Sequence, residues 1–376
     1  MSHSTQQFIP QIQPWIDEQE WLEVRRVMES TYLTENRATE EFESGLRELT
    51  GASHVIAVCN GTAALYCILK ALNIGDGDEV IVPDLTFIAS SNSVIMAGAR
   101  PVFAPIKMES LDFDFEKLPE LITPKTKAIM PVHLYGRSSD MEALSQLANN
   151  NKLKIIEDAA QAIGVQFNGT HVGCFGEAGA ISFYGNKTIT CGEGGAILTN
   201  SDSIALTCRR LKNHGRSQRG TFIHEYIGFN FSMTEMQAAV GIAQLRKLNE
   251  IVARKEEIFT AYITGLSDIP QLKSFPIDPR CKPVHWFTSF YAEDRNKLAA
   301  YLSSLGIQTR LFFCPLHMQP CYSGWPDQGI DYSSSQRAYE HGISLPSSYT
   351  LTDEELAHVI DSVRRFYLSP VGSIDA

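Results

Sequence analysis

The chain has 376 residues, of which 44% are hydrophobic and 20% are charged, the composition of a globular protein with a large core and room for two domains. The formal net charge of −11 at pH 7 argues against a nucleic-acid partner, because phosphate binding needs a basic surface. No apolar run is long enough to span a membrane and the polar N-terminus does not resemble a signal peptide, so we expect a cytoplasmic protein with no membrane partner.

The first half of the chain shows two helical patterns followed by a regular alternation of strands and helices. Residues 15–50 have helical periodicity with a polar break at 34–39. Short apolar runs then alternate with helical segments; the runs are 54–58, 79–82, 101–106, 127–132 and 153–157, and the helical segments include 63–72, 88–97 and 141–150. This alternation predicts an α/β fold with a mainly parallel sheet covered on both faces, whose ligands bind beyond the carboxyl ends of the strands.

The second half contains a predicted hairpin, a long helix and a smaller domain. Two β-prone runs, 180–184 and 196–199, flank a glycine-bearing connection, and helices are expected up to about residue 212 and over 233–264. Beyond the proline-bearing stretch 270–283 we expect strands near 286–291 and 308–313 and helices at 295–305 and 353–367. The predicted parts are an N-terminal segment 1–35, a large domain 36–250 and a small α+β domain 251–376.

Lys187 lies in the connection of the predicted hairpin. A lysine held in an apolar setting has a lowered pKa, and its neutral amine is a nucleophile toward carbonyl carbon. Because most lysines are exposed, a solvated turn lysine remains the alternative for this residue taken alone. Asn186 separates Gly185 from Lys187 and breaks the P-loop pattern, which disfavours an NTPase.

Two further motifs lie at expected strand ends. In Asn60-Gly-Thr-Ala, Gly61 lets the backbone approach an anion and Thr62 offers a hydroxyl beside a helix start, although the motif is also a plain helix N-cap. Glu157 and Asp158 end a buried strand, where carboxylates need a positive partner. Asp158 could pair with the protonated ring nitrogen of pyridoxal phosphate (PLP), or the two carboxylates could cap a helix.

One basic run stands out against the acidic total: Arg209, Arg210, Lys212, Arg216 and Arg219. A solvated helix end and loop is one interpretation, and contact with a small phosphorylated ligand is the other, since arginine is enriched at phosphate sites. The eight cysteines show no close pair typical of a zinc site, and we expect reduced, packed thiols and no metal.

Taken together, these motifs resemble the fold-type I PLP enzymes, and within them the DegT/StrS-like nucleotide-sugar aminotransferases. The resemblance covers residues 14–367, and its most specific segments are Asn60-Gly-Thr-Ala, Asp78-Glu-Val-Ile-Val-Pro, Glu157-Asp-Ala-Ala-Gln-Ala-Ile-Gly, Ser182-Phe-Tyr-Gly-Asn-Lys-Thr-Ile-Thr and Gly192-Glu-Gly-Gly. Residues 182–195 are most similar to the GDP-perosamine synthases, which aminate the 4-keto group of GDP-4-keto-6-deoxy-mannose. The resemblance implies an aspartate-aminotransferase-like large domain with a smaller C-terminal domain.

The resemblance also implies which residues hold the cofactor ring. Lys187 would bond covalently to PLP and then move the proton during transamination. Asp158 would hold the pyridinium nitrogen, Gln161 would lie near the phenolic oxygen, and Phe87 would stack on the ring face.

For the cofactor phosphate, the resemblance implies a site built by two chains. Gly61, Thr62, Ala63 and Ser182 would bind it from one subunit, and Asn230 would reach it from a neighbouring subunit. The active unit would therefore be a homodimer or a larger homo-oligomer with shared active sites.

On the substrate side the candidates are Asn186, Arg310 and His317, with a structural loop histidine as the alternative for His317. The family usually has a basic residue where Ser232 stands here, and often a glycine-rich turn at residues 35–38, which leaves those substrate contacts open.

The resemblance implies transfer of an amino group from glutamate to a nucleotide-linked 4-keto-6-deoxy sugar, as in amino-sugar, polysaccharide or lipopolysaccharide O-antigen biosynthesis. A UDP- or dTDP-linked 3- or 4-keto sugar is the alternative substrate. A sugar dehydratase, which would have histidine in place of Lys187, and a non-catalytic binding module are the competing functions.

Overall fold

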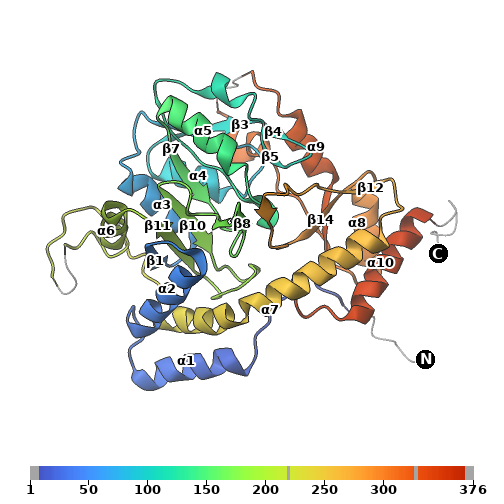
Figure 1. The fold of residues 1–376 in the computed structure, drawn as a ribbon, viewed down its shortest axis with the longest axis horizontal. Helices are drawn as coiled ribbons and strands as arrows, with labels where there is room; N and C mark the ends of the chain where they lie inside the picture. The colour runs from blue at the N-terminus through green and yellow to red at the C-terminus, as the bar shows by residue number, and fades with distance from the viewer. Residues whose placement is uncertain (1–7, 218–220, 326–328, 369–376) are drawn as a thin grey trace.

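The larger part of the molecule is a seven-stranded sheet between helices (Figure 1). The computed structural model describes residues 8–217, 221–325 and 329–368. In spatial order the strands are β1 (His54–Val58), β11 (Gly195–Thr199), β10 (Ala178–Ser182), β7 (Lys154–Asp158), β6 (Thr126–Ile129), β2 (Glu79–Pro83) and β3 (Arg100–Ala104). β11 is antiparallel to both of its neighbours, and all other adjacent strands are parallel. The predicted mainly parallel α/β sheet and the hairpin that bears Lys187 are confirmed.

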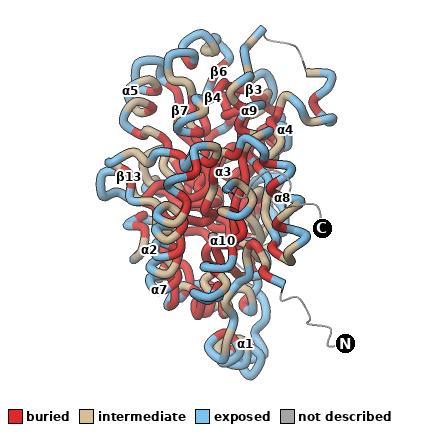
Figure 2. Tube along the Cα trace, turned by 90° about the vertical axis from the view of Figure 1, so that its right-hand side faces the viewer, coloured by how far each residue is buried: buried red, intermediate tan, exposed pale blue. Residues whose placement is uncertain are grey.

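This sheet separates two hydrophobic cores. Successive side chains of a strand point to opposite faces, so Val55 and Ala57 of β1 enter one core while Ile56 and Val58 enter the other. The first core is closed by α2 (Arg37–Thr50), α5 (Met141–Asn151) and part of α7 (Glu235–Gly265), and the second by α3 (Gly61–Ala71), α4 (Ala89–Met96) and α6 (Asp202–Leu211). Figure 2 shows the resulting buried interior beneath an exposed rim.

The N-terminal helix α1 (Glu18–Ser30) lies outside these layers. It packs against α7, and only Glu20 and Val27 of the helix are buried, so it projects from the body of the molecule (Figure 2). Among the helices that the structure describes, none is long and apolar enough to cross a membrane.

The smaller part is a four-stranded antiparallel sheet with its own core. The strand order is β12 (Leu272–Ser274), β14 (Thr288–Ala292), β16 (Gly342–Leu345) and β15 (Arg310–Leu311), and the helices are α8 (Arg295–Ser304), α9 (Ser333–His341) and α10 (Asp353–Leu368). Ile9 forms a bridge with Ile307 and belongs to this core, so the start of the described chain packs on the C-terminal part. α7 continues through residue 250, with Ala238 in the first core and Ile258 in the third.

Short elements fill the connections. They are β4 (Ile106–Lys107), β5 (Asp112–Phe113), β8 (Gln166–Phe167), β9 (Thr170–His171) and β13 (Cys281–Lys282), with 3-10 helices at Leu118–Leu121, Leu134–Gly136, Leu316–Met318 and Pro320–Tyr322. The strand expected over 308–313 is confined to Arg310–Leu311. α9 is not predictable from its sequence, because this serine-rich segment lacks apolar periodicity and buries only Ser335 and Ala338.

Candidate active site

A cavity of about 540 Å³ opens at the carboxyl edge of the large sheet, where β1, β7 and β10 end. Nine of the twelve predicted site residues line it: Gly61, Thr62, Phe87, Asp158, Gln161, Ser182, Asn186, Lys187 and Arg310. The fold thus brings together residues that are far apart in the sequence, at the edge where parallel sheets bind ligands.

Lys187 lies on the connection between β10 and β11, and its backbone N–H donates to the carbonyl oxygen of Tyr184 at 2.8 Å. The residue is only partly buried, because its amino group faces the cavity, but the protein packed around it lowers its pKa to about 7. The charge of Asp158 opposes this shift, and that of Arg310 adds to it. A lysine with this pKa supplies a neutral amine near neutral pH.

Asp158 is the last residue of β7 and is 5% exposed. Its Oδ2 accepts a hydrogen bond from the hydroxyl of Ser90 at 2.6 Å, and its Oδ1 accepts one from the backbone N–H of Ala160 at 3.1 Å. Among the described residues no helix lies between β7 and β8, so the helix-capping alternative is wrong for these carboxylates, and the contact with Ala160 belongs to a turn. These two donors hold the carboxylate at the cavity wall, where it can pair with a cation.

The adjacent Glu157 has a different task. It is completely buried and accepts hydrogen bonds from the backbone N–H groups of Gly173, Phe175 and Gly176, and it contacts His133 at 3.0 Å. Glu157 thus satisfies the backbone of the loop that precedes β10. Of the two carboxylates, only Asp158 lines the cavity.

The side-chain amide of Gln161 is held by the backbone of Tyr135. Its Oε1 accepts the N–H of Tyr135 at 2.9 Å, and Tyr135 has φ of 55°, which is costly for a residue other than glycine. Since the amide oxygen is engaged, the amide NH₂ is the group left to donate to a ligand.

Phe87, at 53% exposed, presents its ring beside Phe313, with a centroid distance of 5.6 Å.

The start of α3 forms an anion cradle. The Oδ1 of Asn60 caps the helix by accepting the N–H of Ala63 at 2.8 Å, while the first N–H groups of a helix have no partner within it. A Cβ on Gly61 would lie 3.1 Å from the Cβ of Ser182, so glycine keeps this approach open. The N-cap and anion-site interpretations therefore apply to the same turn, with the hydroxyls of Thr62 and Ser182 as further donors.

This donor set fits PLP. The cradle offers N–H and hydroxyl donors to a phosphate, Asp158 offers a carboxylate to a pyridinium, and Lys187 offers an amine to an aldehyde, all on one cavity.

Three predicted residues do not line this cavity. Ala63 is 3% exposed within α3. Asn230 lines a separate cavity of about 530 Å³ together with Ser232. The backbone N–H and Nδ1 of His317 contact the two carboxylate oxygens of Asp84 at 2.9 and 2.8 Å, an arrangement that supports the loop-histidine alternative.

The basic run is largely paired within the protein, so the solvated interpretation is wrong for its central residue. Lys212 is 2% exposed and forms an ion pair with Glu35 at 2.9 Å. Arg209 pairs with Glu43 at 3.0 Å and Arg210 with Glu225 at 2.7 Å, while Arg219 lies outside the described residues.

The lining residues to which no role was assigned from the sequence include Tyr184, Glu193, Trp286 and Phe313. Tyr184 and Glu193 flank the predicted lysine, so their proximity in the sequence was a usable signal. Trp286 and Phe313 come from the C-terminal part of the chain, and nothing local in their sequence indicates that they face Lys187.

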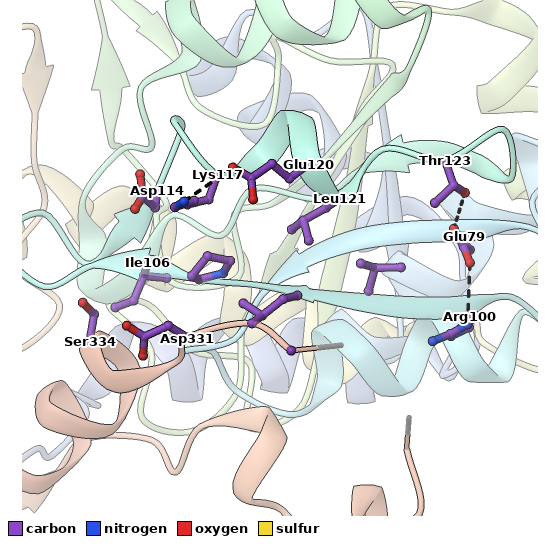
Figure 3. A pocket seen from close by; sticks show the side chains of 14 residues that line it. Glu79, Arg100, Ile106, Asp114, Lys117, Glu120, Leu121, Thr123, Asp331 and Ser334 are labelled. Carbon is purple, nitrogen blue, oxygen red and sulfur yellow. Dashed lines mark hydrogen bonds and ion pairs between the residues drawn. The ribbon is translucent and has the colours of Figure 1, made fainter. Parts of the chain in front are cut away.

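A second cavity of about 550 Å³ lies beside β3 and the segment before α9 (Figure 3). Four of its charged groups form two pairs: Glu79 contacts Arg100 at 3.7 Å, and Lys117 contacts Glu120 at 3.4 Å. Glu79 also accepts a hydrogen bond from the hydroxyl of Thr123 at 2.6 Å. This cavity contains none of the predicted site residues, and we therefore place the candidate active site at Lys187.

The chain is similar to known proteins over almost its whole length. Residues 14–364 match the model of the DegT/DnrJ/EryC1/StrS aminotransferase family. The chain is 36% identical over 364 residues to the GDP-perosamine synthase of Escherichia coli O157:H7, covering 96% of this chain and 99% of that protein. It is 34% identical over 345 residues to the dTDP-3-amino-3,4,6-trideoxy-α-D-glucose transaminase of Streptomyces venezuelae, covering 91% and 90%. The PLP form of the putative sugar aminotransferase Spr1654 from Streptococcus pneumoniae superposes with a TM-score of 0.89 at 26% identity, covering 95% of this chain and 97% of that one.

Proposed function

The chain belongs to the DegT/DnrJ/EryC1/StrS aminotransferase family, and from this premise we propose that it moves an amino group from glutamate to the 4-keto group of a GDP-linked 4-keto-6-deoxy sugar. The family and the relatives named above show the general activity, which is that of a PLP-dependent sugar aminotransferase. The observation that supports the proposed chemistry most strongly is the cavity that Lys187 and Asp158 share with the anion cradle of α3.

Each group of the cavity has a task in this reaction. Bound PLP supplies an electron sink for transfer of the amino group. Lys187, whose pKa is about 7, provides the amine that bonds to the cofactor and, once released, moves a proton. Asp158 would hold the positive ring nitrogen, Gln161 would donate its amide, and Phe87 would cover a ring face, since all three residues line the cavity.

The proposal of a GDP-linked substrate rests on the lysine segment 182–195. The names of the two relatives above refer to a GDP-linked and a dTDP-linked sugar, and these proteins are 36% and 34% identical to this chain. Overall sequence identity therefore does not decide which nucleotide the substrate of this chain carries. The segment similar to the GDP-perosamine synthases includes Asn186 and Lys187, both of which line the cavity. An amino sugar for a surface polysaccharide such as an O-antigen, made in the cytoplasm, belongs to the same proposal.

A homodimer with shared active sites is also part of the proposal. Asn230 does not line the Lys187 cavity of its own chain. This position is expected for a residue that contributes to the site of a neighbouring subunit. It follows an aromatic loop whose apolar side chains are strongly exposed, with Phe222 at 82% and Ile227 at 89%. Exposed apolar surface of this kind is typical of protein interfaces.

A three-step experiment tests the proposal. The purified protein is expected to contain PLP with visible absorbance, and glutamate should convert that absorbance to the pyridoxamine form. GDP-, UDP- and dTDP-linked keto sugars are then compared by mass spectrometry of the product, and amination of only the GDP-4-keto-6-deoxy sugar is expected. A protein without PLP would support the binding module, loss of the 3-hydroxyl without amination would support a dehydratase, and preference for a UDP- or dTDP-linked sugar would overturn the substrate.

A further inference from the structure

Trp286 contacts Lys187 in two ways, and none of the roles above uses it. The side chain is 2% exposed and lines the cavity, with its ring centroid 4.0 Å from the Nζ of Lys187. Its indole N–H donates to the carbonyl oxygen of Asn186 at 2.6 Å. One side chain thus touches the amino group of the lysine and the backbone of the residue before it.

The indole ring is supported from its other face. Phe287 stacks on Trp286 with a centroid distance of 3.8 Å and an interplanar angle of 21°. Two groups that both lie about 4 Å from one ring centroid would collide over the same face, so we infer that Phe287 and the Nζ of Lys187 flank the ring from opposite faces. The ring therefore cannot retreat from the lysine without displacing Phe287.

The backbone of Trp286 is fixed as well. Its carbonyl oxygen accepts a hydrogen bond from the Nζ of the buried Lys255 at 3.2 Å. Two residues earlier, the N–H of Val284 donates to the carbonyl oxygen of Gly136 at 3.0 Å. Gly136 has φ of 80°, and a Cβ there would lie 1.7 Å from the carbonyl oxygen of Val284, so this approach requires glycine.

We propose that Trp286 is a positioning residue for Lys187: its ring holds the amino group while the lysine is not bonded to the cofactor, and its N–H fixes the lysine loop through Asn186. The inference rests on the proposed function, in which Lys187 must leave the cofactor, stay in place and move a proton. A cation over an indole face is attracted by the ring quadrupole, whereas burial disfavours the same charge. The charged groups that share the cavity with Lys187 are Asp158, Glu193 and Arg310.

Fluorinated tryptophan tests the contact without changing the shape of the side chain. Fluorine withdraws electron density from the ring face, so the protonated lysine should lose stabilisation. In full-length protein freed of cofactor, the pH dependence of Lys187 labelling by an amine-directed reagent is followed by peptide mass spectrometry. We expect the midpoint to fall by about half a pH unit when trifluorotryptophan replaces tryptophan.

The chain contains four tryptophans, so the same replacement is made in the variant Trp286→Phe. The inference requires that fluorination leave the labelling midpoint unchanged in that background. A midpoint that does not move in the full protein, or that moves equally in Trp286→Phe, would overturn it. Because this measurement needs neither PLP nor sugar, it separates failure of this inference from failure of the proposed function.

A kinetic comparison tests the positioning role of the whole indole side chain. Trp325 is the matched control, since its N–H also donates to a backbone carbonyl oxygen, that of Pro101 at 3.3 Å, away from the cavity. We expect Trp286→Phe to lower kcat about tenfold with KM for glutamate within about twofold, because a shifted lysine slows proton transfer more than binding. Trp325→Phe should change neither constant. Equal effects of the two variants, or an effect of Trp286→Phe on KM alone, would contradict a positioning role.

Discussion

Lys187 and Lys255 are both surrounded by protein, and burial lowers the pKa of each to about 7. Lys187 faces an open cavity that also contains Asp158 and aromatic rings. Lys255 is 2% exposed, and its Nζ donates to the backbone carbonyl oxygens of Trp286 and Ser347. A lowered pKa therefore does not by itself identify a catalytic lysine; access for a ligand and a carboxylate partner make the difference.

The two lysines are also connected. Trp286 contacts Lys187 with its ring and accepts a hydrogen bond from Lys255 with its carbonyl oxygen. α7 bears Lys255, whose Nζ donates to the carbonyl oxygens of both Trp286 and Ser347, so Lys255 ties these two segments to each other and to α7. We interpret Lys255 as structural support and Lys187 as the reactive amine.

Removing the amino group of Lys187 is expected to have the largest effect on activity. Lys187→Ala should lower the transamination rate by roughly 10⁴-fold or more, because both the covalent attachment point and the proton carrier are lost. Steady-state assays with glutamate and the keto sugar measure this, with thermal unfolding as the folding control. Retention of more than about a hundredth of the activity would contradict the role given to Lys187.

The adjacent carboxylates provide the next comparison. Asp158→Asn should lower kcat by roughly 10²- to 10³-fold, because a neutral amide cannot stabilise the positive ring nitrogen. It should also lower the pKa of Lys187 further, since the charge of Asp158 raises it. Glu157→Gln is the contrast: its amide would face three backbone N–H donors, so we expect a lower unfolding temperature. Loss of activity without loss of stability in Glu157→Gln would reverse the assignment.

The part of the site at the ends of the large-sheet strands could be predicted from the sequence. Asn60, Asp158 and Lys187 each lie at or soon after the end of a strand whose apolar run is visible locally, and the sheet brings those ends together. Trp286 and the burial of Lys255 could not be predicted, because both depend on contacts between segments far apart in the chain. The same holds for Lys212, whose partner Glu35 lies in the N-terminal segment.

The smallest expected effect is on the pH dependence of stability. The pKa of Lys255 is about 7 in the folded protein and about 10.4 in the unfolded chain. Between these pH values the unfolded state binds more protons than the folded state, so the free energy of unfolding rises with pH. Well below pH 7 both states are protonated, and the cost of burying the charge is complete. Relative to Lys255→Met, the wild type should gain at most about 1.4 kcal/mol per pH unit between pH 7 and 9.

Urea unfolding of the two proteins at pH 6, 7, 8 and 9 measures this difference. The difference between wild type and Lys255→Met should change little near pH 6, begin to move in favour of the wild type as pH 7 is approached, and change most steeply between pH 8 and 9. A difference that is the same at every pH would show that Lys255 is protonated in the folded protein throughout this range.

The central claim, that Lys187 and not another buried lysine binds the cofactor, has a direct test. The PLP-loaded protein is reduced with borohydride, which makes the bond between cofactor and lysine permanent, and its peptides are mapped by mass spectrometry. We predict the pyridoxyl group on the peptide that contains Lys187 and none on the peptide that contains Lys255. A pyridoxyl group on Lys255, or on any lysine outside the cavity in place of Lys187, would contradict the account.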